Sequence, residues 1–283
     1  MGYLIKNMTV DDLDFAAKCT AGEGWITETM EDFENFLAFD PSGCFIAEHN
    51  NKQAGICIAT SYGENGFIGE LIVSPGHRGN GIGTALICEA IDYLKENGAL
   101  SIYLDGDLPA VPMYEKLGFK KICKSLRFTG RVTGRPHINI QTVTEKDLAE
   151  IFKLDVALFG AERTYFLERK FKNHPTLCKV VRVDNKIKGY LFAKNNSSVI
   201  SVGPWVVLDR KINPISMIEV LAYELGNVNF RIGVLESNSV AAKLLRSLEK
   251  MNEGDYSIRM VLGENSLLGM NESIYGLGSP AKG

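Results

Sequence analysis

The chain has 283 residues, 45% of them hydrophobic and 23% charged, and its formal net charge is -3. This composition is typical of a soluble globular protein, and the length favours two domains, because a single core seldom grows beyond roughly 250–300 residues. The chain is slightly acidic and has no long run of like charge, so its composition gives no sign of a basic surface that would bind nucleic acid or an anionic membrane.

The N-terminus, the cysteines and the histidines indicate a cytoplasmic protein without a metal. Met1 to Lys6 lacks the apolar stretch of a signal peptide, and Asn7 does not suit a myristoylation signal. No segment approaches the ~18 apolar residues of a membrane span. The six cysteines form no C-x-x-C pair, and Cys44 and Cys57 lie in apolar, strand-like runs, which indicates reduced, buried thiols. The four histidines are isolated, so we expect no metal site.

Apolar periodicity divides residues 3–128 into strands and helices. Gly98 and Gly118 follow helical segments, where a left-handed C-terminal residue is expected. Helices interleaved with a mixed sheet predict an α/β fold of the α+β mixed-sheet type, with helices flanking each sheet. The predicted order is strand 3–7, helix 10–20, helix 28–38, strand 43–49, strand 54–62, strand 67–73, helix 81–97, strand 101–105, helix 109–117 and strand 119–128.

The chain repeats itself. Residues 5–13 match residues 140–148, and in both copies a short strand leads to Thr-x-x-Asp-Leu, a helix-starting signature with a capping threonine and an acid in the first turn. Residues 51–59 match residues 185–193, each a polar turn of a β-hairpin. Asp107 to Tyr114 corresponds to Asn238 to Leu245. Three matches in the same order at nearly constant offset predict two copies of one fold.

The two copies define two tandem domains. The segment 130–136 contains two glycines and a proline, which suits a linker. We therefore expect a domain at residues 1–133 and a second at residues 137–283.

A glycine-rich loop follows the strand that ends at Val73. Its glycines, at positions 79, 81 and 83, lie just where a helix begins, with Ile82, Leu86, Ala90 and Leu94 at spacing four. The free N–H groups and the positive end of the helix dipole favour a phosphate or pyrophosphate there, and Arg78 can add a charge-assisted contact.

Two other interpretations of this loop stay open. The first is a tight strand-to-helix turn without a ligand. The second is a dinucleotide-binding fingerprint, since Asp105 ends a strand 24 residues after Gly81. Against the second, the glycines run G-x-G-x-G instead of G-x-G-x-x-G, and the loop does not open the first βαβ unit.

The run from Leu71 to Leu86 closely resembles the signature of the GNAT superfamily of N-acetyltransferases, in which R/Q-x-x-G-x-G/A holds the pyrophosphate of acetyl-CoA. The segment 114–119 also falls where that family has it. With both copies included, the whole chain resembles tandem GNAT proteins with a divergent C-terminal GNAT-like domain. The resemblance implies acetyl-CoA as cofactor, bound by Leu71, Ile72, Val73, Arg78, Gly79, Asn80, Gly81, Ile82, Gly83, Thr84, Asp107 and Tyr114.

The resemblance also implies catalytic groups. It places the thioester beside a strand edge that is splayed from its neighbour, where the Val73 N–H would stabilise the oxyanion. Tyr114 stands where many GNAT enzymes carry a general acid for the departing thiolate, although a helix tyrosine can also simply pack its ring. Glu70 precedes the binding strand and could be the general base, or water could serve instead. The family usually has Asn at the position of Asp107, so this sequence departs from the pattern at the usual side-chain contact to CoA.

The segment 22–25 lies where the family builds its acceptor pocket. Trp25 could form a wall of that pocket and Glu23 could contact a cation, whereas an ordinary buried tryptophan is the alternative. The sequence does not identify the acceptor, and it leaves open whether another acyl-CoA serves as donor.

The second copy lacks the chemistry of the first. No glycine follows Trp205 until Gly226, so the pyrophosphate loop is gone, and Leu245 stands where the first copy has Tyr114. We expect a structural partner domain that completes or covers the acceptor site. It could also replace the second subunit of dimeric relatives, which favours a monomer. The segment 266–278 is too apolar to be a free tail, so we expect it to dock, with Tyr275 as a possible acceptor contact.

Together these features predict a cytoplasmic acyltransferase that moves an acetyl group from acetyl-CoA to a primary amine, most readily a small molecule, by direct attack in a ternary complex. Two alternatives remain. A non-catalytic acetyl-CoA or CoA sensor would keep the loop without turnover, and a structural tandem domain would not bind CoA.

Overall fold

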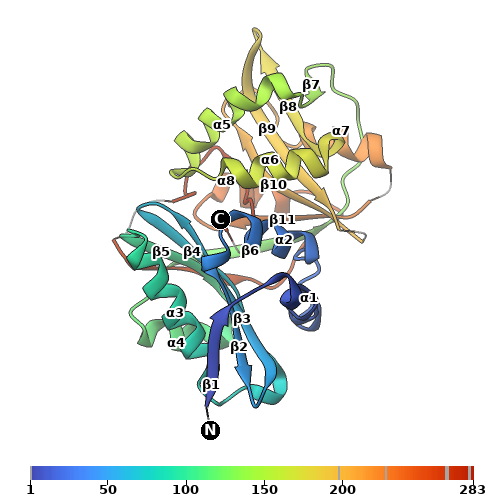
Figure 1. Ribbon diagram of the computed structural model, residues 1–283. Helices are drawn as coiled ribbons and strands as arrows, with labels where there is room; N and C mark the ends of the chain where they lie inside the picture. Colours follow the sequence, from blue (N-terminus) through green and yellow to red (C-terminus); the bar gives the residue numbers. More distant parts are fainter. Residues whose placement is uncertain (1, 197, 227, 265–267, 280–281) are drawn as a thin grey trace. The chain divides into compact units, whose positions relative to one another are not determined.

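The computed structural model describes residues 2–196, 198–226, 228–264, 268–279 and 282–283. The chain divides into two compact units (Figure 1). Unit 1 consists of residues 1–122, 259–266 and 282, and unit 2 consists of residues 123–258, 267–281 and 283. The sequence predicted a boundary at the end of the first repeat, at residues 133–137. The compact units instead exchange a segment near the end of each repeat.

The helices and strands of the first repeat follow the predicted order. They are β1 (Tyr3–Asn7), α1 (Leu13–Gly22), α2 (Met30–Phe39), β2 (Cys44–His49), β3 (Lys52–Tyr62), β4 (Asn65–Val73), α3 (Ile82–Glu96), β5 (Ser101–Gly106), α4 (Val111–Lys116) and β6 (Lys120–Gly130). The predicted mixed-sheet fold is confirmed.

The sheet of unit 1 is mixed. Strands β1 to β4 are antiparallel neighbours in chain order, β4 and β5 are parallel, and β13 (Ser257–Gly263) lies beside β5. Helix α3 packs on one face of the sheet and α1 with α2 on the other (Figure 1). The four predicted apolar positions of α3, Ile82, Leu86, Ala90 and Leu94, are all buried, as expected for the core-facing stripe of an amphipathic helix.

The second repeat gives the remaining elements. They are β7 (Ile140–Thr142), α5 (Glu145–Phe159), α6 (Thr164–Asn173), β8 (Lys179–Val183), β9 (Lys186–Asn195), β10 (Ile200–Val207), α7 (Ser216–Leu225), β11 (Phe230–Leu235), α8 (Ser239–Arg246), β12 (Met251–Glu253), β13 and β14 (Ile274–Gly276).

The sheet of unit 2 has the order β6-β11-β10-β9-β8-β7, with β12 paired to β6 and β14 paired to β10. Alternate residues of its strands face two cores. One core joins Val180, Tyr190 and Phe192 to helices α5 and α6, and the other joins Leu191, Ala193 and Val202 to helices α7 and α8. The two sets alternate along the strands, so each face of this sheet is buried under its own pair of helices.

The signals that the two repeats share produce the same local structures. The carboxylate of Asp12 accepts a hydrogen bond from the Thr9 main-chain N–H at 2.9 Å, and Asp147 accepts one from Thr144 at 2.8 Å, so both copies begin a helix with a capping box. The hairpin turns also agree, because Asn50-Asn51 and Asp184-Asn185 all have positive φ. Two left-handed residues in a row match the twist of the flanking strands.

Candidate active site

Strand β4 carries a bulge at its centre. Gly69 lies opposite Ile58 of β3 and Ile72 lies opposite Ile56, so β4 has one more residue than its partner over this stretch. Glu70, within the bulge, has φ +51 and is 3% exposed. A left-handed conformation is costly for a residue with a side chain and is found where the surroundings enforce it, often at functional sites. The bulge therefore holds the predicted general base in a buried, fixed position.

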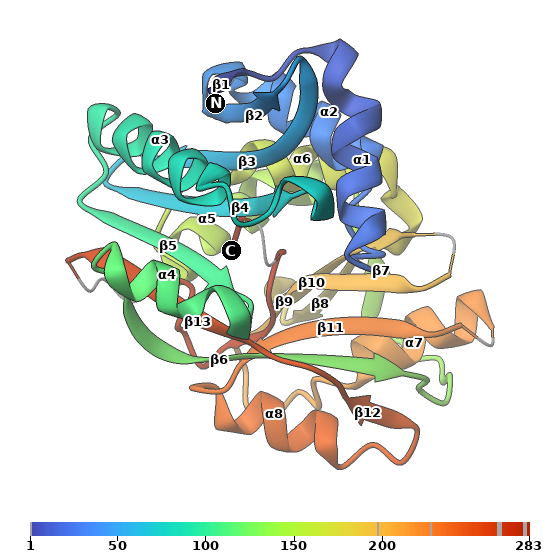
Figure 2. The same cartoon turned by 90° about the horizontal axis from the view of Figure 1, so that it is seen from below.

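Strands β4 and β5 separate beyond the bulge. Their pairing runs from Asn65–Ser101 to Ile68–Leu104 and stops there. Figure 2 shows that β4 and β5 diverge along their length. We call the stretches Gly69–Val73 and Asp105–Gly106, which do not pair with each other, the β4/β5 fork. This is the splayed edge that the family resemblance implied. Main-chain groups of β4 on this side are not used by the β4–β5 ladder.

The glycine loop leads from the fork into helix α3. Gly79 and Gly81 have φ near +79° and +78°, and a Cβ at either position would have no neighbour within 4 Å. The N-terminus of α3 has no side-chain cap, and its first main-chain bond, from Ala85 N–H to the Gly81 carbonyl, leaves the preceding amides unused by the helix. An uncapped helix N-terminus next to an open, exposed loop fits the pyrophosphate of a CoA donor.

Arg78 has two partners in the structure. Its Nε donates to the Val73 carbonyl at 2.8 Å, and its Nη2 pairs with the Glu23 carboxylate. The sequence assigned Arg78 to the cofactor and Glu23 to the acceptor, and the structure joins the two side chains. Both predicted roles stay predictions. About half of the Arg78 side chain is exposed, which leaves room for an anion to compete with Glu23.

Tyr114 lies on α4 with 6% of its surface exposed. Its ring packs edge-on against Phe119 at 6.0 Å and against the backbone of β5, since a Cβ at Gly106 would be 2.7 Å from the tyrosine ring. The hydroxyl makes no hydrogen bond to any residue that the structure describes. Burial raises the pKa of Tyr114 well above its ordinary value, and Cys57 and Asp107 raise it further, which keeps the phenol protonated at neutral pH.

Cys57 of β3 connects the two catalytic candidates. Burial raises the pKa of this thiol, and the nearby Glu70 carboxylate raises it further. The same thiol is close enough to Tyr114 to influence its ionisation. Glu70 and Tyr114, 44 positions apart in sequence, therefore lie in one neighbourhood around Cys57. Asp107 is exposed on the surface, just before the short 3-10 turn that leads into α4.

The end of α1 lies against the end of β4. Burial raises the pKa of Cys19 to about 11, a hydrogen bond with Ser74 opposes that rise, and Glu23 adds to it. Glu23 is therefore close to the loop after β4. Trp25 is half-buried, and its main-chain N–H donates to the Thr20 carbonyl at 2.9 Å. Its predicted contact with the acceptor stays a prediction.

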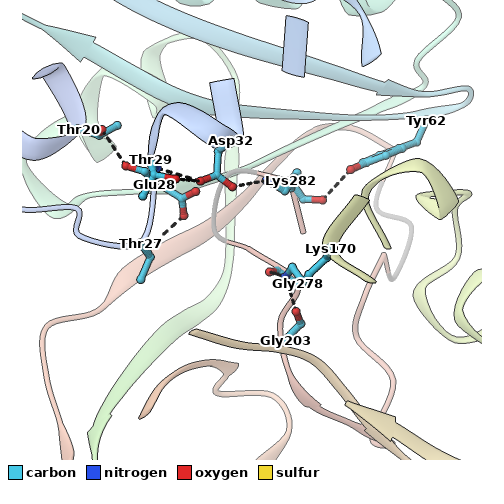
Figure 3. A network of polar contacts seen from close by, with 10 residues as sticks. All are labelled: Thr20, Thr27, Glu28, Thr29, Asp32, Tyr62, Lys170, Gly203, Gly278 and Lys282. Atoms are coloured by element: carbon cyan, nitrogen blue, oxygen red, sulfur yellow. Dashed lines mark hydrogen bonds and ion pairs between the residues drawn. The ribbon is translucent and has the colours of Figure 1, made fainter. Parts of the chain in front are cut away.

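Sequence reasoning missed a polar cluster on α2 (Figure 3). The Lys282 ammonium is 3.5 Å from an Asp32 carboxylate oxygen and 4.5 Å from the centre of the Phe36 ring. The Lys282 carbonyl accepts a hydrogen bond from the Tyr62 hydroxyl at 2.9 Å. Figure 3 also shows Lys170 of unit 2, whose ammonium donates to the Gly203 carbonyl at 2.5 Å. Lys282 lies far from Asp32 in sequence, so no local pattern could have joined them.

Unit 2 contains a second fork. Pairing of β10 with β11 stops at Val202–Ile232, and a bulge in β10 follows. Here β14 fills the opening: Trp205 lies opposite Gly276 and Val206 opposite Ile274. We call the stretches Gly203–Val207 and Gly233–Leu235 the β10/β11 fork.

Further contacts hold β14 in place. The N–H of Val207 donates to the Ser273 carbonyl at 2.9 Å, and the N–H of Leu277 donates to the Gly233 carbonyl at 2.8 Å, so the segment bridges both arms of the fork. The Asn238 amide donates to the carbonyls of Glu272 and Ile274 at 2.9 and 2.8 Å. The tail therefore docks, as expected for residues 268–278, while Ser266 and Leu267 lie outside the described residues. Tyr275 packs on Trp205 at 5.4 Å, and its acceptor role remains a prediction.

Two properties bear on the class of protein. No helix within the described residues is long and apolar enough to span a bilayer. The same residues contain no group of three or more His, Cys, Asp or Glu side chains suited to a metal ion.

The comparisons identify the family. Residues 10–119 match the model of the acetyltransferase (GNAT) family, and residues 151–276 match a second model, of an acetyltransferase (GNAT) domain. The chain belongs to the GNAT acetyltransferase family and has the tandem arrangement. It is 30% identical over 158 residues to an uncharacterized N-acetyltransferase of Methanocaldococcus jannaschii, spanning 46% of this chain and 67% of that protein.

Other relatives match only in part. A mycothiol acetyltransferase of Thermobispora bispora is 33% identical over 34% of this chain and 36% of its own length. Among solved structures, a putative acetyltransferase from Pyrococcus horikoshii has a TM-score of 0.84 at 20% identity, covering 100% of this chain and 96% of that one. A tandem GNAT protein from the clavulanic acid biosynthesis pathway has a TM-score of 0.62 at 13% identity, covering 94% and 100%. At these identities the structural matches show the fold alone.

Proposed function

We propose that the chain is an N-acetyltransferase that moves an acetyl group from acetyl-CoA to a primary amine, by direct attack in a ternary complex. The observation that carries this proposal is the open β4/β5 fork, which continues into an uncapped helix N-terminus with an open glycine loop. The main chain of Leu71 to Val73 would hold the arm of the donor, and the loop from Arg78 to Thr84 its pyrophosphate. When bound, acetyl-CoA supplies the acetyl group as a reactive thioester.

Three groups of the chain would carry the chemistry. The main-chain N–H of Val73 would donate a hydrogen bond to the oxygen that gains charge as the amine attacks. Glu70, buried and fixed in the bulge, would accept the proton that the amine loses, directly or through water. Tyr114 would donate its phenolic proton to the departing sulfur, and its raised pKa keeps that proton available at neutral pH.

The acceptor would enter beside the end of α1. Glu23 and Trp25 lie there, and the Glu23 carboxylate is already paired with a guanidinium, so it suits a cationic group. We propose a small-molecule amine as acceptor, and a monomer as the working form in the cytoplasm.

Turnover tests the proposal. The full chain is incubated with acetyl-CoA and a panel of amines, free thiol is followed with a chromogenic reagent, and acetylated products from a metabolite extract are identified by mass spectrometry. Glu70→Gln is the matched variant, since it keeps the size of the side chain and removes the base. We expect thiol release that depends on the amine and is slower in Glu70→Gln. Binding of acetyl-CoA without amine-dependent release would indicate a sensor, and absence of a thermal shift with CoA a structural protein.

A further inference from the structure

A buried ion pair beside the fork joins the two repeats within unit 1. Arg259 of β13 donates from Nε and Nη2 to the two carboxylate oxygens of Asp105, at 2.5 and 3.3 Å. Both side chains are 1% exposed. The guanidinium also lies 4.9 Å from the centre of the Phe67 ring, on β4. Arg259 belongs to the second repeat, whereas Asp105 and Phe67 belong to the first.

Asp105 occupies a special point on β5. It directly follows Leu104, the last residue that pairs with β4, so it is the first residue of the β5 arm of the fork. The next residue, Gly106, contacts the ring of Tyr114 so closely that an added Cβ would come within 2.7 Å of it. The position of Asp105 therefore determines the surface on which the Tyr114 ring rests.

The ion pair is a poor device for stability alone. Desolvating two charges can cost more than their attraction returns, and an apolar pair of similar volume is often as stable or more stable. The Nη1 group of Arg259 adds to that cost, because it is buried without a hydrogen-bond partner among the described residues. The pair instead fixes geometry, because two hydrogen bonds from a planar guanidinium determine both the distance and the orientation of the Asp105 carboxylate relative to Arg259.

We propose that Arg259 is a positioning residue for acetyl transfer: from the last long strand of the second repeat, it fixes the Asp105–Gly106 arm of the fork and, through it, the ring of Tyr114. The inference rests on the proposed function, because Tyr114 is the acid of that reaction. It also gives the second repeat a direct part in the active site, since the first repeat contains no equivalent of this arginine beside β5 within the described residues.

The test replaces both charges in the full chain. Arg259→Met with Asp105→Leu leaves no unpaired charge behind, so we expect a folded protein whose melting temperature is close to that of the wild type. We expect kcat to fall about tenfold to hundredfold, because small misplacements of catalytic groups cost rates of this order, while the KM for acetyl-CoA changes little. The same exchange at the exposed pair Arg246 and Glu253 is the matched control and should leave both parameters unchanged.

A double-mutant cycle separates positioning from a general structural effect. In a Tyr114→Phe background, the exchange at Arg259 and Asp105 should cost nothing further, because the group that it positions is gone. The single variant Arg259→Lys, with Asp105 and Tyr114 intact, should have a kcat between those of the wild type and of the Arg259→Met, Asp105→Leu variant. Lysine keeps the positive charge but lacks the two-point geometry of the guanidinium. Two results would overturn the inference. One is a wild-type kcat in the variant that carries Arg259→Met and Asp105→Leu. The other is a loss of kcat from this exchange that is as large in the Tyr114→Phe background as in the wild type.

A spectroscopic readout makes the inference independent of turnover. The ionisation of Tyr114 is followed by ultraviolet absorbance, as the difference between each protein and its own Tyr114→Phe variant. In the wild type, burial keeps the pKa of this phenol above its ordinary value, and loosening of the β5 arm should admit water and lower it. An unchanged titration in the Met/Leu variant would overturn the inference. If the titration shifts but no amine is acetylated, the proposed function fails and the positioning stands.

Discussion

In unit 1 the pairing of β4 and β5 ends at Ile68 and Leu104, and among the described residues no strand enters the fork beyond that point. In unit 2 the pairing of β10 and β11 ends at Val202 and Ile232, and β14 enters the fork as an added strand. The repeat thus builds the same opening twice. In unit 2 the added strand β14 takes up main-chain hydrogen bonds of the fork, and in unit 1 no described strand does so.

The two repeats also differ in the residues at the predicted catalytic positions. Glu70 in the bulge of β4 corresponds to Pro204 in the bulge of β10, and Tyr114 corresponds to Leu245. At the start of α7 the N–H groups of Ser216 and Met217 donate to the carbonyls of Asn213 and Pro214, both at 3.2 Å, whereas at the start of α3 the amides before Ala85 are not used by the helix. The copy whose fork is filled therefore lacks counterparts of the predicted base, the predicted acid and the glycine loop.

The largest expected effect comes from removing the second repeat. Residues 1–135 lack β13, so β5 would become an exposed sheet edge, and the buried Asp105 would lose its arginine. An uncovered edge strand and the loss of the arginine that pairs with a buried carboxylate both favour aggregation or unfolding. We expect this fragment to be poorly soluble, with little acetyl-CoA binding or activity, as measured by circular dichroism melting and calorimetry.

A chain that ends at residue 264 is the control, because it keeps β13 and loses β14. It should bind acetyl-CoA, although its second fork is empty. A fragment 1–135 that is monomeric, as stable as the full chain and as active on the identified amine would show that unit 1 does not need the second repeat.

The next effect concerns the number of donor sites. Only the first fork continues into an open glycine loop, so we expect about one acetyl-CoA per chain by calorimetry. Gly81→Glu should abolish binding, because the side chain would enter the space above the loop and its charge would repel the pyrophosphate. Gly63→Glu is the matched control, since Gly63 also has a positive φ and open surroundings but lies in the β3–β4 turn. Two equivalent sites, or full binding by Gly81→Glu, would contradict the comparison.

Much of the fold was predictable because its signals are local. The threonine caps at Thr9 and Thr144, the two hairpin turns and the apolar stripe of α3 each depend on residues a few positions apart, and each forms as predicted. The glycine loop was predictable for the same reason, because an open turn before a helix depends only on consecutive residues.

The exchange of strands was not predictable from such signals. The alternation of a strand indicates which face is buried, but it does not identify the strand that lies beside it. Nothing in β6 indicates that its residues 125–130 pair with β11, nor in β13 that it lies beside β5. Arg259 was missed for this reason: in the sequence it is one arginine in an apolar strand, and its partner Asp105 is 154 residues away.

Loss of the phenol hydroxyl should slow turnover without weakening donor binding. We expect Tyr114→Phe to lower kcat by ~10²–10⁴-fold, the usual contribution of a positioned acid. Ionisation of the phenol should not limit the wild-type rate at neutral pH, because burial raises the pKa of Tyr114 and the protonated form is the active one. Tyr93→Phe is the control, since that phenol of unit 1 binds Asp40 instead. An unchanged kcat, with chemistry shown to be rate-limiting, would reduce Tyr114 to a packing residue.

The smallest effect is expected at Asn238, which holds β14 in the second fork. Its side chain caps α8 by accepting from the Ala241 N–H at 3.0 Å and also donates to two carbonyls of the tail. Asn238→Ala removes these bonds at a site that is 7% exposed, so we expect a loss of about 1–3 kcal/mol in the free energy of unfolding. Asn252→Ala, at an exposed position of β12, should change it little. Acetyl-CoA binding should not change in either variant, because the donor fork lies in the other unit. Faster hydrogen exchange confined to Val206 and Val207, which β14 covers, would locate the lost stability in the second fork. A weaker affinity of Asn238→Ala for acetyl-CoA would contradict the prediction, because the filled fork would then be needed for donor binding at the open one.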